Sequence, residues 1–389
     1  MKILIVRTIA IEEDLSKNTY NNQGVGLATE LGKLGNECAL VYYAKKGNQH
    51  EEIIESDGVF IKVYHIEGKN LVWNAIYDDT LFEICKGYDL IQTSECDQIC
   101  SWQIYKRFPR KTVIYHGPYG SKFTWKYNLR SRVFDVVFSW RNGFKNATVI
   151  TKSKLAEDYL KAKGFRNIIT LGVGLNPYAL ERSIDVLPEK IKQLISEKDN
   201  NKYLLYIGAL SKRKNLLFLL EVFNNLVNVR KHHNYKMVIV GTKAYKEETY
   251  YNRCFQYIKE NDLEKNIIYL GSVEQKYLKY LYTESDLYLL ATQYDIFGMV
   301  YLEALYFGTP IITTQSGGAS LLIKEGETGY IRQLGDVSEW CETAEIVVEK
   351  QIQVDEMREK ERKIIRERFL WSKLAPFFLE VYNELLSRQ

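Results

Sequence analysis

Residues 287–310 read LYLLATQYDIFGMVYLEALYFGTP, and this stretch decides the fold. The apolar run Leu287–Leu290 is typical of a buried strand, and a helix is expected to begin near Gly298. A glycine in such a strand-to-helix turn lets the backbone come close to a ligand. The N–H groups of Met299 and Val300, at the start of the helix, can donate hydrogen bonds to a diphosphate. The stretch therefore predicts a phosphate-binding turn on an α/β sheet.

Glu303 lies one helical turn beyond that start. Its spacing places it on the same face as Met299 and Val300, because residues three and four apart share a helix face. A carboxylate there can accept hydrogen bonds from both hydroxyls of a ribose. The turn and Glu303 together predict a nucleotide site.

Short apolar runs alternate with helical patterns along the whole chain. This alternation predicts parallel sheets between layers of helices. Because 389 residues exceed what one hydrophobic core organises, we expect two Rossmann-like, doubly wound domains facing an inter-domain cleft. The expected strands are 3–6, 39–43, 90–92, 112–115, 148–150 and 168–171 in the first half, and 203–207, 237–240, 267–270, 287–290 and 310–313 in the second.

The polar segment 177–202 separates the two series and is typical of a helix plus linker. We place an N-terminal acceptor-side domain at 1–185 and a C-terminal donor domain at 186–369. The end of the chain has an amphipathic pattern that predicts a terminal helix over 370–389, with Ser372 as its N-cap. We assign this helix to the first domain.

Several classes of protein are disfavoured by what the sequence lacks. The opening apolar run is too short for a signal peptide, and no stretch approaches about 18 uninterrupted apolar residues. Six scattered cysteines without a Cys-x-x-Cys pair indicate reduced thiols, and we expect a cytoplasmic protein. The histidines show no ligand spacing and there is no Asp-x-Asp, so no metal is expected and protein groups must meet phosphate charge.

Residues 101–156 form a basic, aromatic segment with twelve Lys or Arg and a single acid, Asp135. Such a composition suits an anionic membrane surface, at the inner face of the cell membrane, or a phosphate-bearing acceptor. The alternative is a solvated basic face over ordinary core aromatics. Nucleic acid is not expected as a partner, because no nucleic-acid motif accompanies the charge.

The stretch quoted first resembles the Glu-x7-Glu signature of retaining glycosyltransferases of family 4, which have the GT-B fold and belong to the glycosyl transferases group 1. Asp295 stands in the first position and Glu303 in the second. Residues 309–318 and 325–330 are similar to the strand, Gly-Gly turn and Gly-x-x-Gly segment that follow in the family. The resemblance implies transfer of a sugar from a nucleotide diphosphate sugar. It also implies that Asp295 and the backbone around Phe297 and Gly298 orient that sugar.

Residues 206–215 resemble the first strand of the family's donor domain, in which an Arg follows a Gly and a Lys comes five residues later. Lys214 matches that Lys, and the resemblance implies that it contacts the donor diphosphate. Ala209 occupies the Arg position, which removes a cation, and Lys212 and Arg213 are the candidates to replace it. Without compensation, donor binding would weaken roughly 10–150-fold.

Two further likenesses lie in the first half. Residues 22–26 resemble the family's Gly-Gly loop with Gln23 in place of its first glycine, so the backbone at Gly24 is expected to approach phosphate or acceptor. His116 ends the strand 112–115 and matches the family's His, which implies a hydrogen bond to the transferred sugar. Glu95 and Asp97 follow another strand at the same level and are candidates to meet the acceptor. The alternative for residues 22–26 is a helix start with flexible glycines, and the alternative for His116 is a purely structural role.

The resemblance implies a retaining, metal-independent hexosyltransferase whose leaving diphosphate helps to deprotonate the acceptor. The acceptor is expected to be a saccharide or lipid-linked molecule of surface polysaccharide synthesis. No cofactor is expected, and the nucleotide diphosphate sugar is the co-substrate, with a UDP-sugar favoured over a GDP-sugar. The candidate catalytic residues are Asp295, His116 and Lys214, and the candidate donor-binding residues are Gly24, Arg213, Lys214, Phe297, Gly298, Met299, Val300 and Glu303.

Two alternatives stay open. The departures at Ala209 and Asp295 are compatible with a non-catalytic GT-B subunit that partners an active transferase. A sugar-nucleotide epimerase of the same architecture would interconvert the donor sugar without an acceptor. A Rossmann dehydrogenase is disfavoured because no Gly-x-Gly-x-x-Gly follows the first strand.

Overall fold

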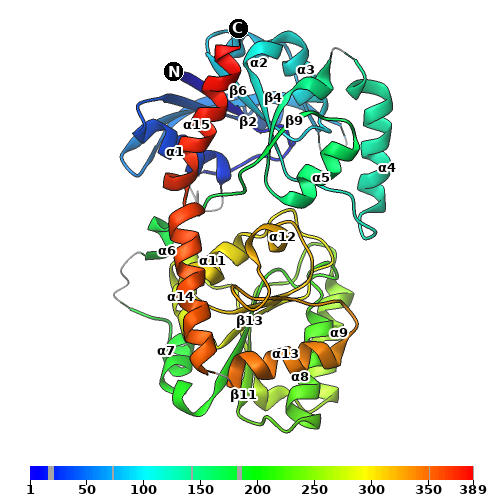
Figure 1. Ribbon diagram of the computed structural model, residues 1–389, viewed down its shortest axis with the longest axis vertical. Coiled ribbons are helices and arrows are strands. Elements are labelled where there is room, and N and C mark those ends of the chain that lie inside the picture. The colour runs from blue at the N-terminus through cyan, green and yellow to red at the C-terminus, as the bar shows by residue number, and fades with distance from the viewer. Residues whose placement is uncertain (16–21, 72–73, 142, 182–185, 350, 389) are drawn as a thin grey trace. The chain divides into compact units, whose positions relative to one another are not determined.

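The computed structural model describes residues 1–15, 22–71, 74–141, 143–181, 186–349 and 351–388. The chain divides into two compact units. The first contains Met1–Leu175 and Phe369–Gln389, and the second contains Asn176–Arg368. Each unit is a sheet flanked by helices (Figure 1).

The sheet of the first unit is parallel except at one edge. Its order is β3-β4-β2-β1-β6-β7-β8-β9, and β5 pairs with β4. The parallel strands are β1 (Lys2–Val6), β2 (Glu37–Ala44), β4 (Val59–Leu71), β6 (Leu90–Ser94), β7 (Thr112–His116), β8 (Thr148–Thr151) and β9 (Asn167–Thr170). Two strands run antiparallel to β4, namely β3 (His50–Ser56) and β5 (Asn74–Tyr77).

Helices cover both faces of this sheet. One apolar core contains Leu4, Val41 and Ile91 from the central strands, and another contains Ile114 and Val149 from the strands beyond. Because a parallel sheet is buried on both faces, most of its strands are continuous apolar runs, which is why the sequence predicted them. The exception is β4, which was not predicted and in which buried residues alternate with exposed or half-buried ones. The helices are α1 (Gln23–Lys33), α2 (Asp79–Lys86), α3 (Ile99–Arg107), α4 (Trp125–Phe134), α5 (Lys154–Ala162) and α15 (Trp371–Ser387).

The terminal helix α15 packs beside α1 and completes the first unit. Its first residue, Trp371, packs so closely on two positions of the chain that only glycine fits at them. A Cβ atom at Gly26 of α1 would lie 2.5 Å from the Trp371 indole, and one at Gly174 would lie 2.3 Å from it. Leu370 is the N-cap and no side chain caps this helix, so the prediction of Ser372 as N-cap was wrong. The last residue of the predicted helix, Gln389, lies outside the described residues.

The boundary between the units lies at Leu175 rather than at 185, and residue 185 itself is outside the described residues. Leu175 is tied to the first unit because its N–H donates to the carbonyl of Phe369 at 2.7 Å. The next element, α6 (Tyr178–Glu181), packs on α10 of the second unit, and Glu181 accepts a hydrogen bond from Tyr306. Segment 176–181 therefore belongs to the second unit, which corrects the expected boundary.

The second unit has a parallel sheet in the order β12-β11-β10-β13-β14-β15. The strands are β10 (Lys202–Ile207), β11 (Tyr235–Val240), β12 (Ile267–Gly271), β13 (Leu287–Leu290), β14 (Ile311–Thr313) and β15 (Tyr330–Ile331). The helices include α7 (Glu189–Ser196), α8 (Leu216–Asn224), α9 (Glu248–Glu260), α10 (Gln275–Glu284), α11 (Met299–Phe307), α13 (Val337–Glu349) and α14 (Gln351–Arg368).

In both sheets the strand order reverses beside the first strand of the unit. The reversal falls between β1 and β6 in the first unit and between β10 and β13 in the second. In open parallel sheets, ligands bind beyond the carboxyl ends of the strands at such a switch point. Among the described residues, no helix is long and apolar enough to cross a bilayer.

The fit of Trp371 against Gly174 gives a stability prediction. We expect Gly174→Ala to destabilise the first unit by about 1–3 kcal/mol, because the added methyl group overpacks the indole. The matched control is Gly87→Ala, where the nearest atom to a new Cβ lies at an ordinary 3.5 Å. Thermal unfolding followed by circular dichroism measures both. Equal melting temperatures for the two variants would contradict this account of the Trp371 packing.

Candidate active site

The two loops that flank the switch point of the second unit bring Lys214 and Asp295 together. Lys214 follows β10 and Asp295 follows β13, and the Lys214 ammonium is paired with the Asp295 carboxylate. The loops are also joined through their backbones, since the N–H of Gln293 donates to the carbonyl of Arg213 at 2.8 Å. Both ion-pair side chains are largely buried. The sequence predicted both residues for the site but not their direct contact.

Arg213 stands beside the same carboxylate. Its Nη1 lies 3.8 Å from Oδ2 of Asp295 and donates to the carbonyl of Tyr294 at 2.7 Å. Of the two cations considered as replacements at the Ala209 departure, the structure therefore places Arg213 at the site. Ala209 and Lys212 are exposed.

Helix α11 begins at Met299, as the sequence predicted, and Gly298 is its N-cap with φ 82°. This is the left-handed region that favours glycine. A Cβ atom at Gly298 would also lie 2.8 Å from the ring of Tyr301. The N–H groups at the helix start, including those of Met299 and Val300, have no partner within the helix by its geometry. They form a site for an anion at the end of β13.

The Gly-Gly turn after β14 presses against the loop that carries Asp295. A Cβ atom at Gly317 would lie 1.8 Å from the carbonyl oxygen of Ile296, and one at Gly318 would lie 2.0 Å from that of Phe297. The N–H of Gly317 donates to the carbonyl of Asp295 at 3.0 Å. Only glycines permit the two backbones to come this close. The Gly-Gly turn therefore holds the backbone around Asp295 and Phe297 in place.

Glu303 is 3% exposed on α11, and Tyr282 of α10 donates its hydroxyl hydrogen bond to Oε2 at 2.8 Å. Tyr282 thus orients the carboxylate that was expected to meet the ribose. The sequence did not reveal this contact, because Tyr282 is one of several tyrosines on an amphipathic helix and nothing distinguishes it there.

The first unit gathers a second polar group at the carboxyl ends of β6, β7 and β8. Glu95, His116 and Lys152 stand on these three neighbouring strand ends. The Glu95 carboxylate lies 3.1 Å from Nζ of Lys152 and 3.1 Å from Nδ1 of His116, and it accepts from the N–H of Gly117 at 2.8 Å. Glu95 has φ 65°, so a strained turn directs its side chain back toward β7.

Glu95 remains ionised although it is fully buried. Burial raises the pKa of its carboxyl group, but Lys152, His116 and the N–H of Gly117 together outweigh that effect and bring the pKa down to about 2. From the sequence, Glu95 is a candidate to bind the acceptor substrate. Its contacts make it a support for His116 and for the backbone at Gly117 instead, and the sequence did not reveal Lys152 as its partner.

His116 is completely buried, and one of its ring nitrogens, Nδ1, has polar contacts within the protein. The N–H of Cys96 points at Nδ1 from 3.1 Å. Its other nitrogen, Nε2, has no hydrogen-bond partner in the part of the chain that the structure describes. A buried polar atom without a partner is costly unless a ligand or water completes it. Nε2 is therefore suited to meet a bound molecule.

At the start of α1, Asn22 is a functional candidate that the sequence analysis missed. Its Oδ1 accepts from the N–H of Val25 at 3.2 Å and from the hydroxyl of Tyr42 at 2.8 Å. The side-chain amide therefore presents Nδ2, which is buried and has no partner among the described residues. Gly24 is the second residue of α1 and not part of a flexible loop. Gly26, read as part of the same loop, serves the packing of Trp371.

Asp97 does not join the group around His116. It is buried near α4, and the nearest cation is Arg130, whose Nη2 lies 3.5 Å from Oδ2. Two neighbouring acids on one loop thus have different roles, since Glu95 turns toward β7 and Asp97 turns toward the basic segment.

The sequence of the second unit matches a known family. Residues 188–367 match the family model described as Glycosyl transferases group 1. The chain is 26% identical over 197 residues to the N-acetyl-alpha-D-glucosaminyl L-malate synthase of Bacillus anthracis, covering 51% of this chain and 49% of the relative. It is 24% identical over 242 residues to the capsular polysaccharide biosynthesis glycosyltransferase CapM of Staphylococcus aureus, covering 61% and 59%. The matches span less than two thirds of these curated relatives.

Solved structures show the fold over the whole chain. The Anabaena protein Alr3699/HepE, solved in complex with UDP, aligns with a TM-score of 0.72 at 16% identity, covering 99% of this chain and 100% of that one. The chain therefore has the GT-B glycosyltransferase fold, and the predicted fold class is confirmed. The match to the family model is confined to residues 188–367, which lie within the second unit.

The Glu95 cluster gives a pH-dependent prediction. Lys152→Met leaves a buried carboxylate without its main cation and should destabilise the protein by about 3–5 kcal/mol near pH 7. The pKa of Glu95 is lowered in the folded state, so the stability it contributes is present above the ordinary value of 4.5 and is lost as the pH falls toward 2. The difference between wild type and Lys152→Met should therefore shrink below pH 4.5.

Thermal unfolding at pH 7 and at pH values below 4.5 measures this difference. The control is Lys154→Met, which removes an exposed lysine two residues away and should change stability by less than about 1 kcal/mol at either pH. A penalty for Lys152→Met that is the same at both pH values would refute the assigned pairing.

Proposed function

We propose that the protein is a retaining, metal-independent glycosyltransferase that moves a hexose-type sugar from a nucleotide diphosphate sugar to a hydroxyl of a saccharide, glycolipid or glycan acceptor. The observation that carries this proposal is the placement of Lys214 and Asp295 on the two loops of a switch point, beside the open start of α11. The capsular polysaccharide relative supports a role in surface polysaccharide or glycoconjugate synthesis. The UDP bound to the Anabaena protein supports a UDP-sugar donor.

The proposed reaction depends on stabilising the leaving diphosphate. Lys214 leaves its pair with Asp295 to meet the phosphates, Arg213 supplies the charge that Ala209 lacks, and the N–H groups at the start of α11 bind the remaining oxygens. A preorganised donor of this kind contributes roughly 10²–10³ in rate. The diphosphate in turn assists removal of the acceptor proton, so no separate protein base is required.

Positioning of the two substrates falls to the remaining groups. Glu303, oriented by Tyr282, accepts the ribose hydroxyls, and Asp295 binds hydroxyls of the transferred sugar. Within the first unit, Nε2 of His116 and the start of α1 at Gly24 and Asn22 are the groups that we assign to a bound saccharide. Orientation of this kind accelerates transfer by holding the reacting atoms in line.

The basic segment supports a second proposal, attachment to an anionic membrane surface. Its helix α4 continues as a π-helical turn through Asp135–Ser139. Exposed apolar residues recur along its outer face at helical spacing, while its inner face packs in the core through Phe134 and Ser131. The outer residues are Trp125, Leu129, Val133, Val136 and Trp140, with the two tryptophans 64% and 74% exposed.

This outer face of α4 combines apolar and basic groups. Lys126 lies over the ring of Trp125, and Lys145 lies 4.1 Å from the ring centre of Trp140. Tryptophan beside lysine is the composition of interfacial helices, in which apolar side chains enter the acyl boundary and cations meet anionic headgroups. We infer that the acceptor is lipid-linked and that the protein meets it at such a membrane surface.

A turnover screen tests the catalytic proposal. The full chain is incubated with UDP- and GDP-sugars, and release of free nucleoside diphosphate is measured with and without simple saccharide acceptors. Slow release from one donor, faster with acceptor and giving a product with the donor's anomeric configuration, is the expected result. Donor binding without release would favour the non-catalytic subunit, and interconversion of the donor sugar would favour the epimerase.

Substitutions at the donor site separate binding from transfer. We expect Asp295→Asn to abolish most transfer while nucleotide binding, followed by thermal shift with UDP, stays measurable. Glu303→Ala should mainly weaken nucleotide binding, because its carboxylate is assigned to the ribose. The matched control is Lys212→Ala, an exposed lysine in the Lys214 loop. Transfer by Asp295→Asn equal to that of wild type would overturn the role of Asp295.

Vesicle binding tests the membrane surface. We expect sedimentation with vesicles of phosphatidylcholine and phosphatidylglycerol, weakened by salt, and no sedimentation with phosphatidylcholine alone. Trp125→Ser with Trp140→Ser should lower the affinity about 10-fold or more per tryptophan. The control is Tyr245→Ser, an exposed aromatic of the second unit. Equal vesicle binding by wild type and the double variant would show that α4 is not the contact.

A further inference from the structure

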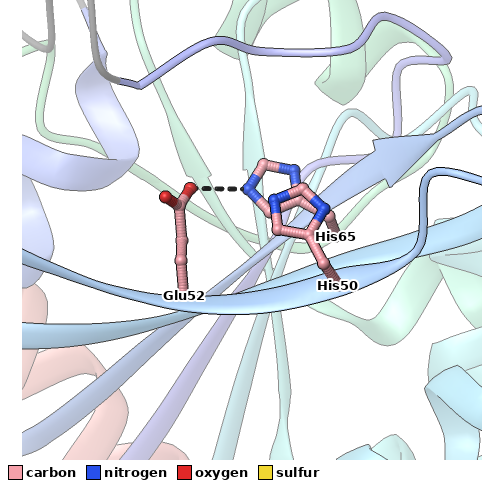
Figure 2. Close-up of side chains that lie close together, drawn as sticks. All are labelled: His50, Glu52 and His65. Atoms are coloured by element: carbon pink, nitrogen blue, oxygen red, sulfur yellow. Dashed lines mark hydrogen bonds and ion pairs between the residues drawn. The ribbon is translucent and has the colours of Figure 1, made fainter.

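Two histidines and a glutamate meet on the antiparallel edge of the first sheet, apart from every residue used above. His50 and Glu52 stand on β3, and His65 stands on β4. The strand register places His50 directly opposite His65, and Glu52 lies two residues from His50 on the same face. Figure 2 shows the three side chains turned toward one another. Each offers a ligand atom, and these atoms all lie within 4.8 Å of one another.

The contacts within this cluster are close. Nε2 of His65 lies 2.8 Å from Oε1 of Glu52 (Figure 2). The rings of His50 and His65 are stacked, with centroids 4.1 Å apart and planes 6° from parallel. Two imidazoles and one carboxylate thus lie together at the sheet surface.

The backbone fixes the tautomer of His50. Nδ1 of His50 lies 2.8 Å from the carbonyl oxygen of Asn48. A carbonyl oxygen can only accept, so Nδ1 carries the proton and Nε2 of the neutral ring has the lone pair. This is the arrangement of metal-binding histidines, whose second nitrogen commonly donates to a carbonyl or carboxylate.

The surroundings provide both burial and access. His65 is 5% exposed, whereas His50 is exposed, so one ligand is held by packing and the other can adjust. The two histidines line a pocket of about 330 Å³ together with residues from the loop after β1 and the end of β2. Two acids in that loop are already bound to cations, Glu12 to Lys45 and Glu13 to Arg7. Glu52 is the acid that faces the histidines.

We propose that His50, Glu52 and His65 bind a divalent transition metal of the zinc class, through Nε2 of each histidine and the carboxylate. A His₂Glu set suits Zn²⁺, and nitrogen ligands disfavour Mg²⁺ and Ca²⁺, which prefer oxygen. With metal–ligand bonds of about 2.0–2.2 Å, the ligand atoms must draw together, which a turn of the exposed His50 allows. When the metal binds, the neutral ring of His65 carries its proton on Nδ1, so that the lone pair of Nε2 faces the metal in place of the hydrogen bond to Glu52.

The metal would cross-link β3 to β4 at the exposed edge of the sheet and keep a fourth position for water or an oxygen ligand from the pocket. This inference is independent of the proposed transferase activity, because its residues lie on β3 and β4 and its readout is metal binding. It also departs from the expectation of no metal. That expectation rested on sequence spacing, and here strand pairing rather than spacing brings the ligands together.

Titration of the purified, chelator-treated full chain with Zn²⁺ tests the proposal. Isothermal titration calorimetry is expected to show one zinc per chain, weaker as the pH is lowered because protons compete for the imidazoles, and no binding of Mg²⁺. His50→Ala should weaken zinc binding by about 100-fold or more, since even lost second-shell contacts cost 10–100-fold. Glu52→Gln should weaken it as well.

The control is His233→Ala, an exposed histidine of the second unit, which should bind zinc as wild type does. His50 is on an exposed edge strand, so its removal should leave the circular dichroism spectrum unchanged. Binding of Co²⁺ provides a second readout, because its visible absorption is stronger in four-coordinate than in six-coordinate sites. A wild-type chain that binds no zinc, or a His50→Ala chain that binds it equally well, would overturn the proposal.

Discussion

Parallel strand pairing is the constraint on which the rest of the molecule depends. Because the strands of each unit run in one direction, their carboxyl ends meet at one edge of the sheet. In the second unit, the loops that leave this edge on either side of the strand-order reversal are hydrogen-bonded to each other, since the N–H of Gln293 donates to the carbonyl of Arg213. Lys214 and Asp295 stand on such loops after β10 and β13, and Glu95 and His116 stand at the same edge of the other sheet. Residues far apart in sequence thereby become neighbours without any local signal.

The second constraint is the close packing of backbone at three glycines of the second unit. The loop after β13 must turn sharply at Gly298 and must also accept the backbone of Gly317 and Gly318 within van der Waals reach. A side chain at either glycine of the turn would collide with a carbonyl oxygen, which cannot move without displacing the loop itself. The glycines therefore support the Asp295 carboxylate by holding the backbone that carries it. Their closeness to a ligand is a consequence of the same geometry.

The sequence predicted the fold well because the parallel strands are buried on both faces and appear as continuous apolar runs. It did not predict β3, β4 and β5 of the first sheet or β15 of the second. In β3, the residues are exposed or half-buried at the sheet edge, so that no apolar period marks the strand. The sequence therefore could not predict the pairing of β3 with β4, or the His50–Glu52–His65 cluster that this pairing forms.

Candidate residues were found where a backbone feature accompanies them, such as the glycine before α11 or the strand end at His116. Partners that act only through space were not found. Lys152 and Tyr282 each orient a candidate carboxylate from a different element, and no spacing rule links them to Glu95 or Glu303. Trp371 shows the same limit, because two glycines more than 140 residues apart both serve its indole.

The pair of Lys214 with Asp295 links the two positions at which this chain departs from the family resemblance. Asp295 is one methylene shorter than glutamate, so its carboxylate stays close to its own loop, where Lys214 and Arg213 both reach it. Both basic residues of the Lys214 loop are thus engaged by one acidic side chain. Under the proposed function, a donor diphosphate would have to compete with the Asp295 carboxylate for Lys214, and two phosphates carry more charge than one carboxylate. The Lys214–Asp295 pair would then be the contact that donor binding has to break.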